Sequence, residues 1–270
     1  MPKRTTLRSE PAVSAAVHIR RGYFECRFGQ LHVHQAIPGG GGFEEGTPLL
    51  ALHPATHSGR MFTGLLAALG RDRSAFAPDL PGFGQSDAPA VRSIPEQAAA
   101  IGDFLDTMRL RQVDVLGCGL GMGVALELAA TRPAVRRVVL AALCWAEAPA
   151  LPPSAESADA YLRSQWAGAR SDCGPGAPLP ALISACGERL CNAAEAAHAA
   201  AAEQSYPLGE RLGQIRQPLL LLHAPEWPRG AGLSGSELPA HARRAPCRDI
   251  SVLREAPQAL LGPIQEFLTA

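Results

Sequence analysis

The chain has 270 residues, of which 47% are hydrophobic and 19% are charged. Because this charged fraction lies below the usual ~25% and the apolar content is high, the composition indicates a globular protein rather than a disordered chain. The 25 Lys and Arg residues equal the 25 Asp and Glu residues. Net charge therefore gives no reason to expect a nucleic acid or an anionic membrane as a partner.

The sequence shows no targeting segment and no cysteine cluster that would indicate a class of protein. The opening "MPKRTTLRSEP" is basic, but the apolar run of a signal peptide does not follow it, and no stretch approaches the roughly 20 apolar residues of a membrane span. The seven cysteines are odd in number, irregularly spaced and without a C-x-x-C pair. We therefore expect reduced thiols in a cytoplasmic protein, with no disulfide framework, no metal site and no cofactor.

Apolar runs and turn signals predict strands that alternate with helices along the chain. The expected strands are a hairpin over 22–37 with its turn at Gly29-Gln30, then 49–54, 74–80, 112–117, 136–143, 218–223 and 249–253. The expected helices cover 58–70, 95–109, 120–131 and about 257–268. Such an alternation predicts a mostly parallel central sheet that is flanked by helices on both faces.

The segment 147–213 differs from the rest of the chain. It is rich in alanine, contains seven prolines, and predicts two or three short helices but no strand. We interpret it as a helical cap inserted into an α/β core formed by 1–146 and 214–270. A cap of this kind is expected over the carboxyl ends of the strands, where open α/β folds bind ligands.

Three segments carry a family resemblance in the family's own order. "LLALHPATHSGRMF" is similar to a strand followed by an oxyanion loop, and "VLGCGLGMGVALELAATRP" is similar to a nucleophile-elbow strand and helix. Between them, "FAPDLPGFGQSDAP" carries an Asp-x-Pro-Gly-x-Gly-x-Ser loop at Asp79, Pro81, Gly82, Gly84 and Ser86. Over nearly all of its length the chain resembles the α/β-hydrolase superfamily, which implies the α/β-hydrolase fold.

The positions where this family carries its catalytic triad hold other residues. The elbow motif Gly-x-Ser-x-Gly reads "GCGLG", with Gly119 in place of the nucleophile. Trp227 stands where the resemblance places the acid, and the adjacent Glu226 substitutes only if its loop is re-aimed. The segment 247–270 contains no histidine, and His241 precedes the last expected strand. Hydrolysis through an acyl-enzyme is therefore disfavoured, since it needs a nucleophile, a base and an orienting group.

Two other readings of the glycine-rich turn are weaker. A displaced thiol nucleophile at Cys118 sits one position early and is expected to point away from the site, as a small buried residue would. A dinucleotide-binding G-x-G-x-x-G would need glycine where the chain has Met122 or Val124, so neither register fits.

Polar and aromatic groups remain around the emptied position. The backbone N–H groups of Ala55 and Leu120 can still form an anion-holding pair, because that role needs no side chain. We expect His53 to support the neighbouring backbone, and His57 either to contact a ligand or to face solvent. The three tryptophans either form a core edge or line an apolar wall for a bulky ligand. The expected ligand-contacting residues are Ala55, Thr56, His57, Cys118, Gly119, Leu120, Trp145, Trp166, Glu226 and Trp227.

Two functions follow, and the sequence leaves both open. In its size, its composition and its emptied catalytic positions the chain is similar to the bottromycin-type peptide epimerases. That resemblance implies epimerisation of an aspartate beside a thiazoline ring in a modified macrocyclic peptide. The substrate's own carboxylate would serve as the base, without a catalytic side chain. The alternative is a catalytically dead hydrolase-fold protein that binds or carries a bulky apolar small molecule.

Overall fold

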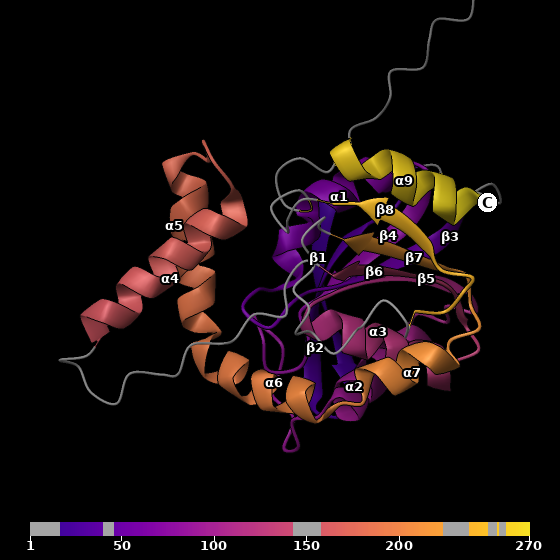
Figure 1. Ribbon diagram of the computed structural model, residues 1–270, viewed down its shortest axis with the longest axis horizontal. Coiled ribbons are helices and arrows are strands. Elements are labelled where there is room, and N and C mark those ends of the chain that lie inside the picture. The colour runs from indigo at the N-terminus through magenta and orange to yellow at the C-terminus, as the bar shows by residue number, and fades with distance from the viewer. Residues whose placement is uncertain (1–16, 40–45, 143–157, 224–237, 248–252, 254–257) are drawn as a thin grey trace, which may run out of the picture.

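The structure is a computed structural model that describes residues 17–39, 46–142, 158–223, 238–247, 253 and 258–270. Its strands form one eight-stranded sheet in the order β1-β2-β4-β3-β5-β6-β7-β8 (Figure 1). The strands are β1 (Ile19–Cys26), β2 (Gly29–Ala36), β3 (Gly46–Leu52), β4 (Arg73–Pro78), β5 (Val113–Cys118), β6 (Val135–Ala142), β7 (Leu219–His223) and β8 (Arg243–Pro246). Only the pairs β1·β2 and β2·β4 are antiparallel. The mostly parallel sheet that the sequence predicts is therefore confirmed.

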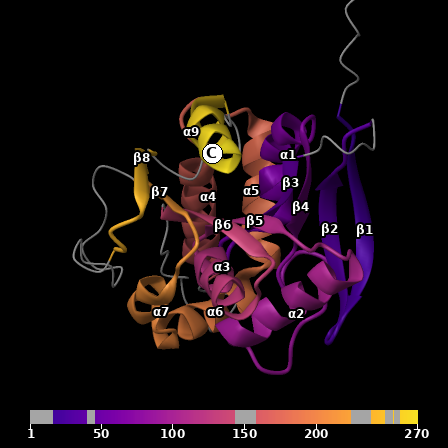
Figure 2. The same ribbon diagram turned by 90° about the vertical axis from the view of Figure 1, so that its right-hand side faces the viewer.

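Helices cover both faces of this sheet. They are α1 (Thr63–Leu69), α2 (Ile94–Thr107), α3 (Leu120–Thr131), α4 (Ala158–Cys173), α5 (Leu179–Cys191), α6 (Ala193–Ser205), α7 (Leu208–Gln214) and α9 (Gln258–Thr269), with a short 3-10 helix η1 (Gly59–Phe62). Leu50 and Leu52 of β3 pack in the core with α2, α3 and α7, whereas Leu49 and Ala51 pack with α1 and α9. The two helical layers lie on opposite sides of the sheet (Figure 2). Successive strand residues point to opposite faces, so a strand buried on both sides reads as a continuous apolar run.

Several element boundaries differ from the sequence prediction. The hairpin turns at Arg27-Phe28, since β2 already begins at Gly29. The predicted strand over 249–253 is wrong in its described part, because Leu253 is helical and 249–252 lie outside the described residues. The last described strand is β8, which pairs in parallel with β7. His241 precedes β8 in the chain, as it precedes the last strand in the sequence prediction, whereas the family's catalytic histidine is expected after that strand.

In the described residues between β6 and β7, four helices, α4 to α7, follow one another, where the sequence predicts two or three. In the described part of the predicted cap, 158–213, the chain forms no strand. Helices α4 and α5 pack against each other beside one end of the sheet (Figure 1). The division into a core and a cap at 147–213 remains a prediction, and 147–157 lie outside the described residues. No described helix has the length and apolar character that would let it cross a membrane.

Candidate functional site

The turn between β5 and α3 is a sharp elbow with glycine at its apex. Gly119 has φ 53° and ψ −124°, a conformation that glycine adopts without the strain other residues would carry. The flanking glycines let the backbone segments approach closely. A Cβ on Gly117 would lie 2.2 Å from the Gly121 carbonyl oxygen, and one on Gly121 would lie 2.3 Å from the Leu52 carbonyl oxygen. The geometry of a nucleophile elbow is therefore present, while its apex carries no side chain.

Two backbone N–H groups beside this elbow, those of Ala55 and Leu120, come from the loop after β3 and from the start of α3. Leu120 is the first residue of the 12-residue helix α3, whose N-terminus carries partial positive charge. Ala55 belongs to the loop after β3, which the hydrogen bond from Gly121 N–H to the His53 carbonyl oxygen (3.1 Å) ties to the elbow. Among the described residues, neither the Ala55 nor the Leu120 N–H donates to an acceptor. Both groups therefore remain available to an anionic ligand group.

His53 is held by two backbone groups. Its Nε2 accepts the Leu80 N–H at 2.8 Å, so its Nδ1 carries the proton and donates to the Pro54 carbonyl oxygen at 2.9 Å. The ring is fully buried, and burial lowers its pKa. With both nitrogens engaged and little tendency to take up a proton, His53 supports the backbone as the sequence predicts, and it is no free base.

His57 is part of a buried polar network that joins the loop after β3 to helices α4 and α5. These helices belong to the segment that the sequence predicts to be a cap, and we refer to them and to α6 as the cap helices. Its Nε2 lies 3.3 Å from Asp172 Oδ2, and its Nδ1 lies 2.9 Å from Thr56 Oγ1. Arg189 donates to Asp172 Oδ2 at 2.7 Å, to Thr56 Oγ1 at 3.4 Å and to Gln165 Oε1 at 3.2 Å. The pattern is satisfied when Thr56 donates to His57 Nδ1 and His57 Nε2–H donates to Asp172. His57 is thus a buried structural link, not the solvent-facing loop residue of one expectation.

The charge of Asp172 is stabilised inside this network. Burial alone would raise the pKa of Asp172, but the hydrogen bond from His57 and the positive charge and hydrogen bond of Arg189 outweigh it and hold the pKa below its usual range. At neutral pH the carboxylate is therefore ionised although its side chain is only 10% exposed. A buried carboxylate of this kind depends on its cationic partner.

Further contacts dock the cap on the loops that follow β3 and β4. The Asn192 side chain, between α5 and α6, donates to the His57 carbonyl oxygen and accepts the Gly84 N–H, both at 3.0 Å. Ser58 donates a short hydrogen bond to Glu188 of α5. The cap is therefore fastened to the two loops that shape the site, on both sides of His57.

The sequence-predicted site residues fall into three groups. Ala55, Thr56, His57, Gly119 and Leu120 lie on the loops at the carboxyl ends of β3 and β5, as expected. The Cys118 side chain is fully buried in the core layer of α1 and α9, so it cannot reach a ligand without movement of that core. The residues Trp145, Glu226 and Trp227 lie outside the described residues.

Trp166 faces a hollow within the cap itself. This hollow of about 680 Å³ lies between α4 and α5, and Leu182 and Gly176 also line it. No residue of the loops after β3 or β5 is part of its described lining. The structure therefore does not bring Trp166 together with Thr56, His57 or Gly119.

Sequence reasoning missed the cap partners Asp172, Arg189 and Asn192. A charged pair on two alanine-rich helices carries the same pattern as a solvated helix surface. Because Arg189 lies 133 positions from Thr56, nothing local in the sequence indicates their contact.

Comparisons with known proteins agree with this geometry. The family described as alpha/beta hydrolase fold matches residues 47–177, which contain β3, the loop at Asp79 and the elbow at Gly119. A 2-hydroxymuconate semialdehyde hydrolase from Pseudomonas sp. (strain CF600) is 34% identical over 102 residues. That match covers 35% of this chain, and it spans only 36% of the hydrolase.

Solved structures resemble the chain over nearly its whole length. Epoxide hydrolase CorEH gives a TM-score of 0.72 at 15% identity, covering 93% of this chain and 99% of its own. A mutant of the N-acyl homoserine lactonase AidH gives a TM-score of 0.69 at 19% identity, covering 93% and 96%. Sequence identities this low support a shared fold, but they do not indicate a shared activity. Together with the family match over residues 47–177, the sheet order and the elbow, they show that the chain has the α/β-hydrolase fold.

Proposed function

We propose that the protein is a non-hydrolytic α/β-hydrolase-fold enzyme that epimerises an acidified Cα–H in a modified macrocyclic peptide, at an aspartate beside a thiazoline. The observation that carries the proposal is the elbow itself. Its backbone geometry is kept and the Ala55 and Leu120 N–H groups have no acceptor among the described residues, while the apex residue Gly119 has no side chain. A site of this kind can bind and orient an anionic ligand, and it cannot form an acyl-enzyme at that position.

The described histidines of the loop after β3 support a base that comes from the ligand. His53 and His57 both have their two ring nitrogens engaged by protein groups. In the proposed step the ligand carboxylate takes the α-proton, and the electron pair of the broken C–H bond delocalises into the adjacent C=N bond. A water molecule then donates a proton to the opposite face of the carbon, and the ligand carboxyl releases the proton that it took to the hydroxide left behind. No atom is gained or lost, and no cofactor takes part.

The protein's part in this step is to bind, to orient and to exclude bulk water. A carboxylate held between the N–H groups of Ala55 and Leu120 is fixed relative to the α-proton, and orientation alone lowers the barrier. Dipoles act more strongly in a dry site than in water. The compared hydrolases share this fold, and the apex glycine at 119 gives this chain no side chain that could form an acyl-enzyme there.

An exchange experiment tests this function. The protein is incubated with a thiazoline peptide in deuterated water, and the α-position is followed by mass spectrometry and NMR. We expect deuterium incorporation with inversion in the wild type, loss of both in Gly119→Leu, and less than a tenfold decrease in His57→Ala, below about 1.4 kcal/mol. Thermal unfolding of each variant controls for misfolding.

Each contrary outcome has a definite meaning. Tight binding without exchange or inversion would replace the enzyme with the ligand-binding alternative. A loss of tenfold or more in a folded His57→Ala variant would make His57 a base and refute catalysis by the ligand's own carboxylate.

A gain-of-function variant gives a second test. Gly119→Ser places a hydroxyl at the apex, at a strain cost of roughly 1–3 kcal/mol. We expect no turnover of p-nitrophenyl esters and no labelling by a fluorophosphonate, because the described histidines beside the apex are engaged by protein groups and are not free to activate the hydroxyl. Labelling of the folded variant at the stoichiometry of a serine hydrolase would contradict the proposal, and wild-type protein is the matched control.

A further inference from the structure

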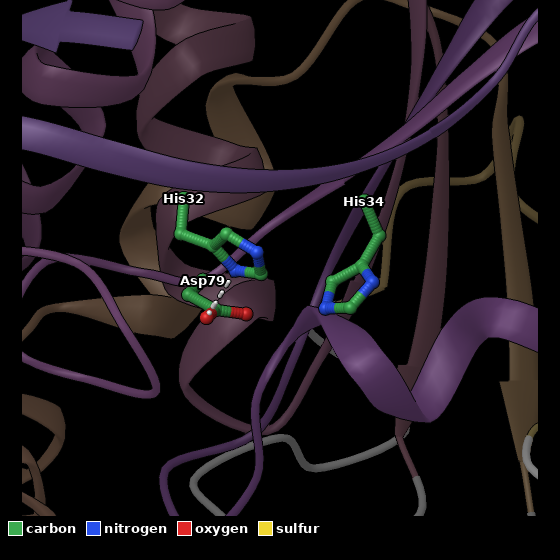
Figure 3. A group of neighbouring side chains, drawn as sticks. All are labelled: His32, His34 and Asp79. Atoms are coloured by element: carbon green, nitrogen blue, oxygen red, sulfur yellow. Dashed lines mark hydrogen bonds and ion pairs between the residues drawn. The ribbon is translucent and has the colours of Figure 1, made fainter. Parts of the chain in front are cut away.

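A second cluster of ligating side chains lies on β2, on the far side of the loop after β4. His32 and His34 alternate with the core residues Leu31 and Val33, so both imidazoles leave the same face of the strand. Their ring centroids are 4.8 Å apart, with the planes close to perpendicular. Asp79, from the end of β4, lies beside both rings (Figure 3). Only 3%, 6% and 2% of these three residues, in chain order, is exposed.

The spacing of the three residues is close to that of ligands on one cation. One ligand atom from each of the three lies within 4.8 Å of the other two. His32 Nδ1 and Asp79 Oδ2 are 2.9 Å apart, and two ligands on one tetrahedral Zn²⁺ lie roughly 3.3 Å apart at bond lengths of about 2.0–2.1 Å. In this structure a proton lies between His32 Nδ1 and Asp79 Oδ2. A bound cation would take the place of that proton and contact both atoms.

Asp79 is held rigidly, while His34 is free to adjust. The Asp79 carboxylate also accepts the Gly59 N–H at 2.8 Å and the Gln85 N–H at 2.9 Å, which fix it from two loops. His34 makes no hydrogen bond to any described residue. Its ring can therefore turn toward His32 and Asp79 and close the set to metal–ligand spacing without losing a hydrogen bond of its own.

The cluster opens on a polar pocket between β2 and α5. The pocket has a volume of about 400 Å³, and all three residues of the cluster line it. Ser58 and Asn192 lie on its walls with Arg60. His34 is more than nine-tenths buried, has no hydrogen bond to a described residue and lines this polar pocket, so its imidazole can bind a ligand that enters there.

We propose that His32, His34 and Asp79 bind a divalent transition-metal ion of the Zn²⁺ type. Two imidazoles and one carboxylate are a donor set that Zn²⁺ and its neighbours prefer over Mg²⁺ or Ca²⁺. Three protein ligands leave one position that faces the pocket, where water completes a tetrahedral shell. The site is distinct from the elbow at Gly119, and its test does not depend on the epimerase proposal.

Metal titration of the full chain tests the site. The protein is stripped with a chelator and then titrated with Zn²⁺ by calorimetry and with Co²⁺ by absorption spectroscopy. We expect one ion per chain, a tetrahedral Co²⁺ spectrum of nitrogen and oxygen ligands, and at least a tenfold weaker dissociation constant in His34→Ala. His34→Ala is expected to fold normally because His34 has no hydrogen bond to lose. His198→Ala, an exposed position on α6, should bind like the wild type.

Three results would overturn the proposal. They are a wild-type protein that binds no Zn²⁺ at micromolar concentration, a folded His34→Ala variant with unchanged affinity, and a Co²⁺ spectrum dominated by sulfur-to-metal charge transfer. The last would place the ion on cysteine thiols instead of on this cluster.

Discussion

Replacing Gly121 by alanine is expected to destabilise the protein by about 3 kcal/mol or more, at the upper end of overpacking effects. The added Cβ would lie 2.3 Å from the Leu52 carbonyl oxygen and 2.8 Å from the Leu52 Cβ. The carbonyl belongs to the backbone of the central strand β3, so relief requires that α3 as a whole moves away from the sheet. Urea unfolding monitored by circular dichroism measures the loss.

Gly123→Ala is the matched control, two residues further along the same helix. Its Cβ would meet the end of the Ile94 side chain at 3.1 Å, and a flexible side chain can give way. Alanine also favours a helix over glycine by about 1 kcal/mol, so the stability of Gly123→Ala should stay within about 1 kcal/mol of the wild type. Equal stability of the two variants would show that the contact between α3 and β3 is not the limiting one.

The Gly121→Ala substitution should also affect ligand binding at the candidate site around Gly119. A displaced α3 moves the Leu120 N–H and the Gly119 apex together, since both lie at its first turn. We therefore expect a folded fraction of Gly121→Ala to bind ligand more weakly than Gly123→Ala does.

The sequence predicts the frame of this protein well, for reasons that lie in its local patterns. Continuous apolar runs such as "LLAL" identify strands that are buried on both faces, and helix α3 begins and ends where the pattern places it. The missed strand β8 is an edge strand with the sequence Arg-Arg-Ala-Pro and three exposed residues. Such a segment carries no apolar alternation, and its pairing with β7 comes only from tertiary structure.

The candidate site could be predicted only where it depends on backbone turns. Glycines at 117, 119 and 121 mark the elbow because close approach and positive φ need them. The role of His57 depends instead on Asp172 and Arg189, which reach it from the cap. Likewise, the alternation of His32 and His34 predicts a strand, whereas their meeting with Asp79 requires the antiparallel pairing of β2 with β4. Contacts between residues so far apart in the chain cannot be predicted from the spacing of residues in the sequence.

The second large effect is expected at Arg189. Removing its guanidinium in Arg189→Ala leaves the buried Asp172 carboxylate with His57 as its remaining described partner. Breaking a buried ion pair from one side costs about 3–5 kcal/mol, because the remaining charge is not compensated. We expect a loss near the lower figure, since Asp172 keeps its contact with His57. Arg163→Ala, at an exposed position on α4, should change stability by less than about 0.5 kcal/mol.

A double-mutant cycle separates the charge of this network from its packing. If the cost of Arg189→Ala comes from the uncompensated carboxylate, then adding Asp172→Asn should restore a large part of the stability, because the neutral amide needs no cation. The coupling between the two substitutions should then exceed about 1 kcal/mol in urea unfolding at neutral pH. If the double variant is as unstable as Arg189→Ala alone, the arginine stabilises the cap through its contacts with Gln165 and Thr56, and the charge of Asp172 has no part in holding the cap on the loop after β3.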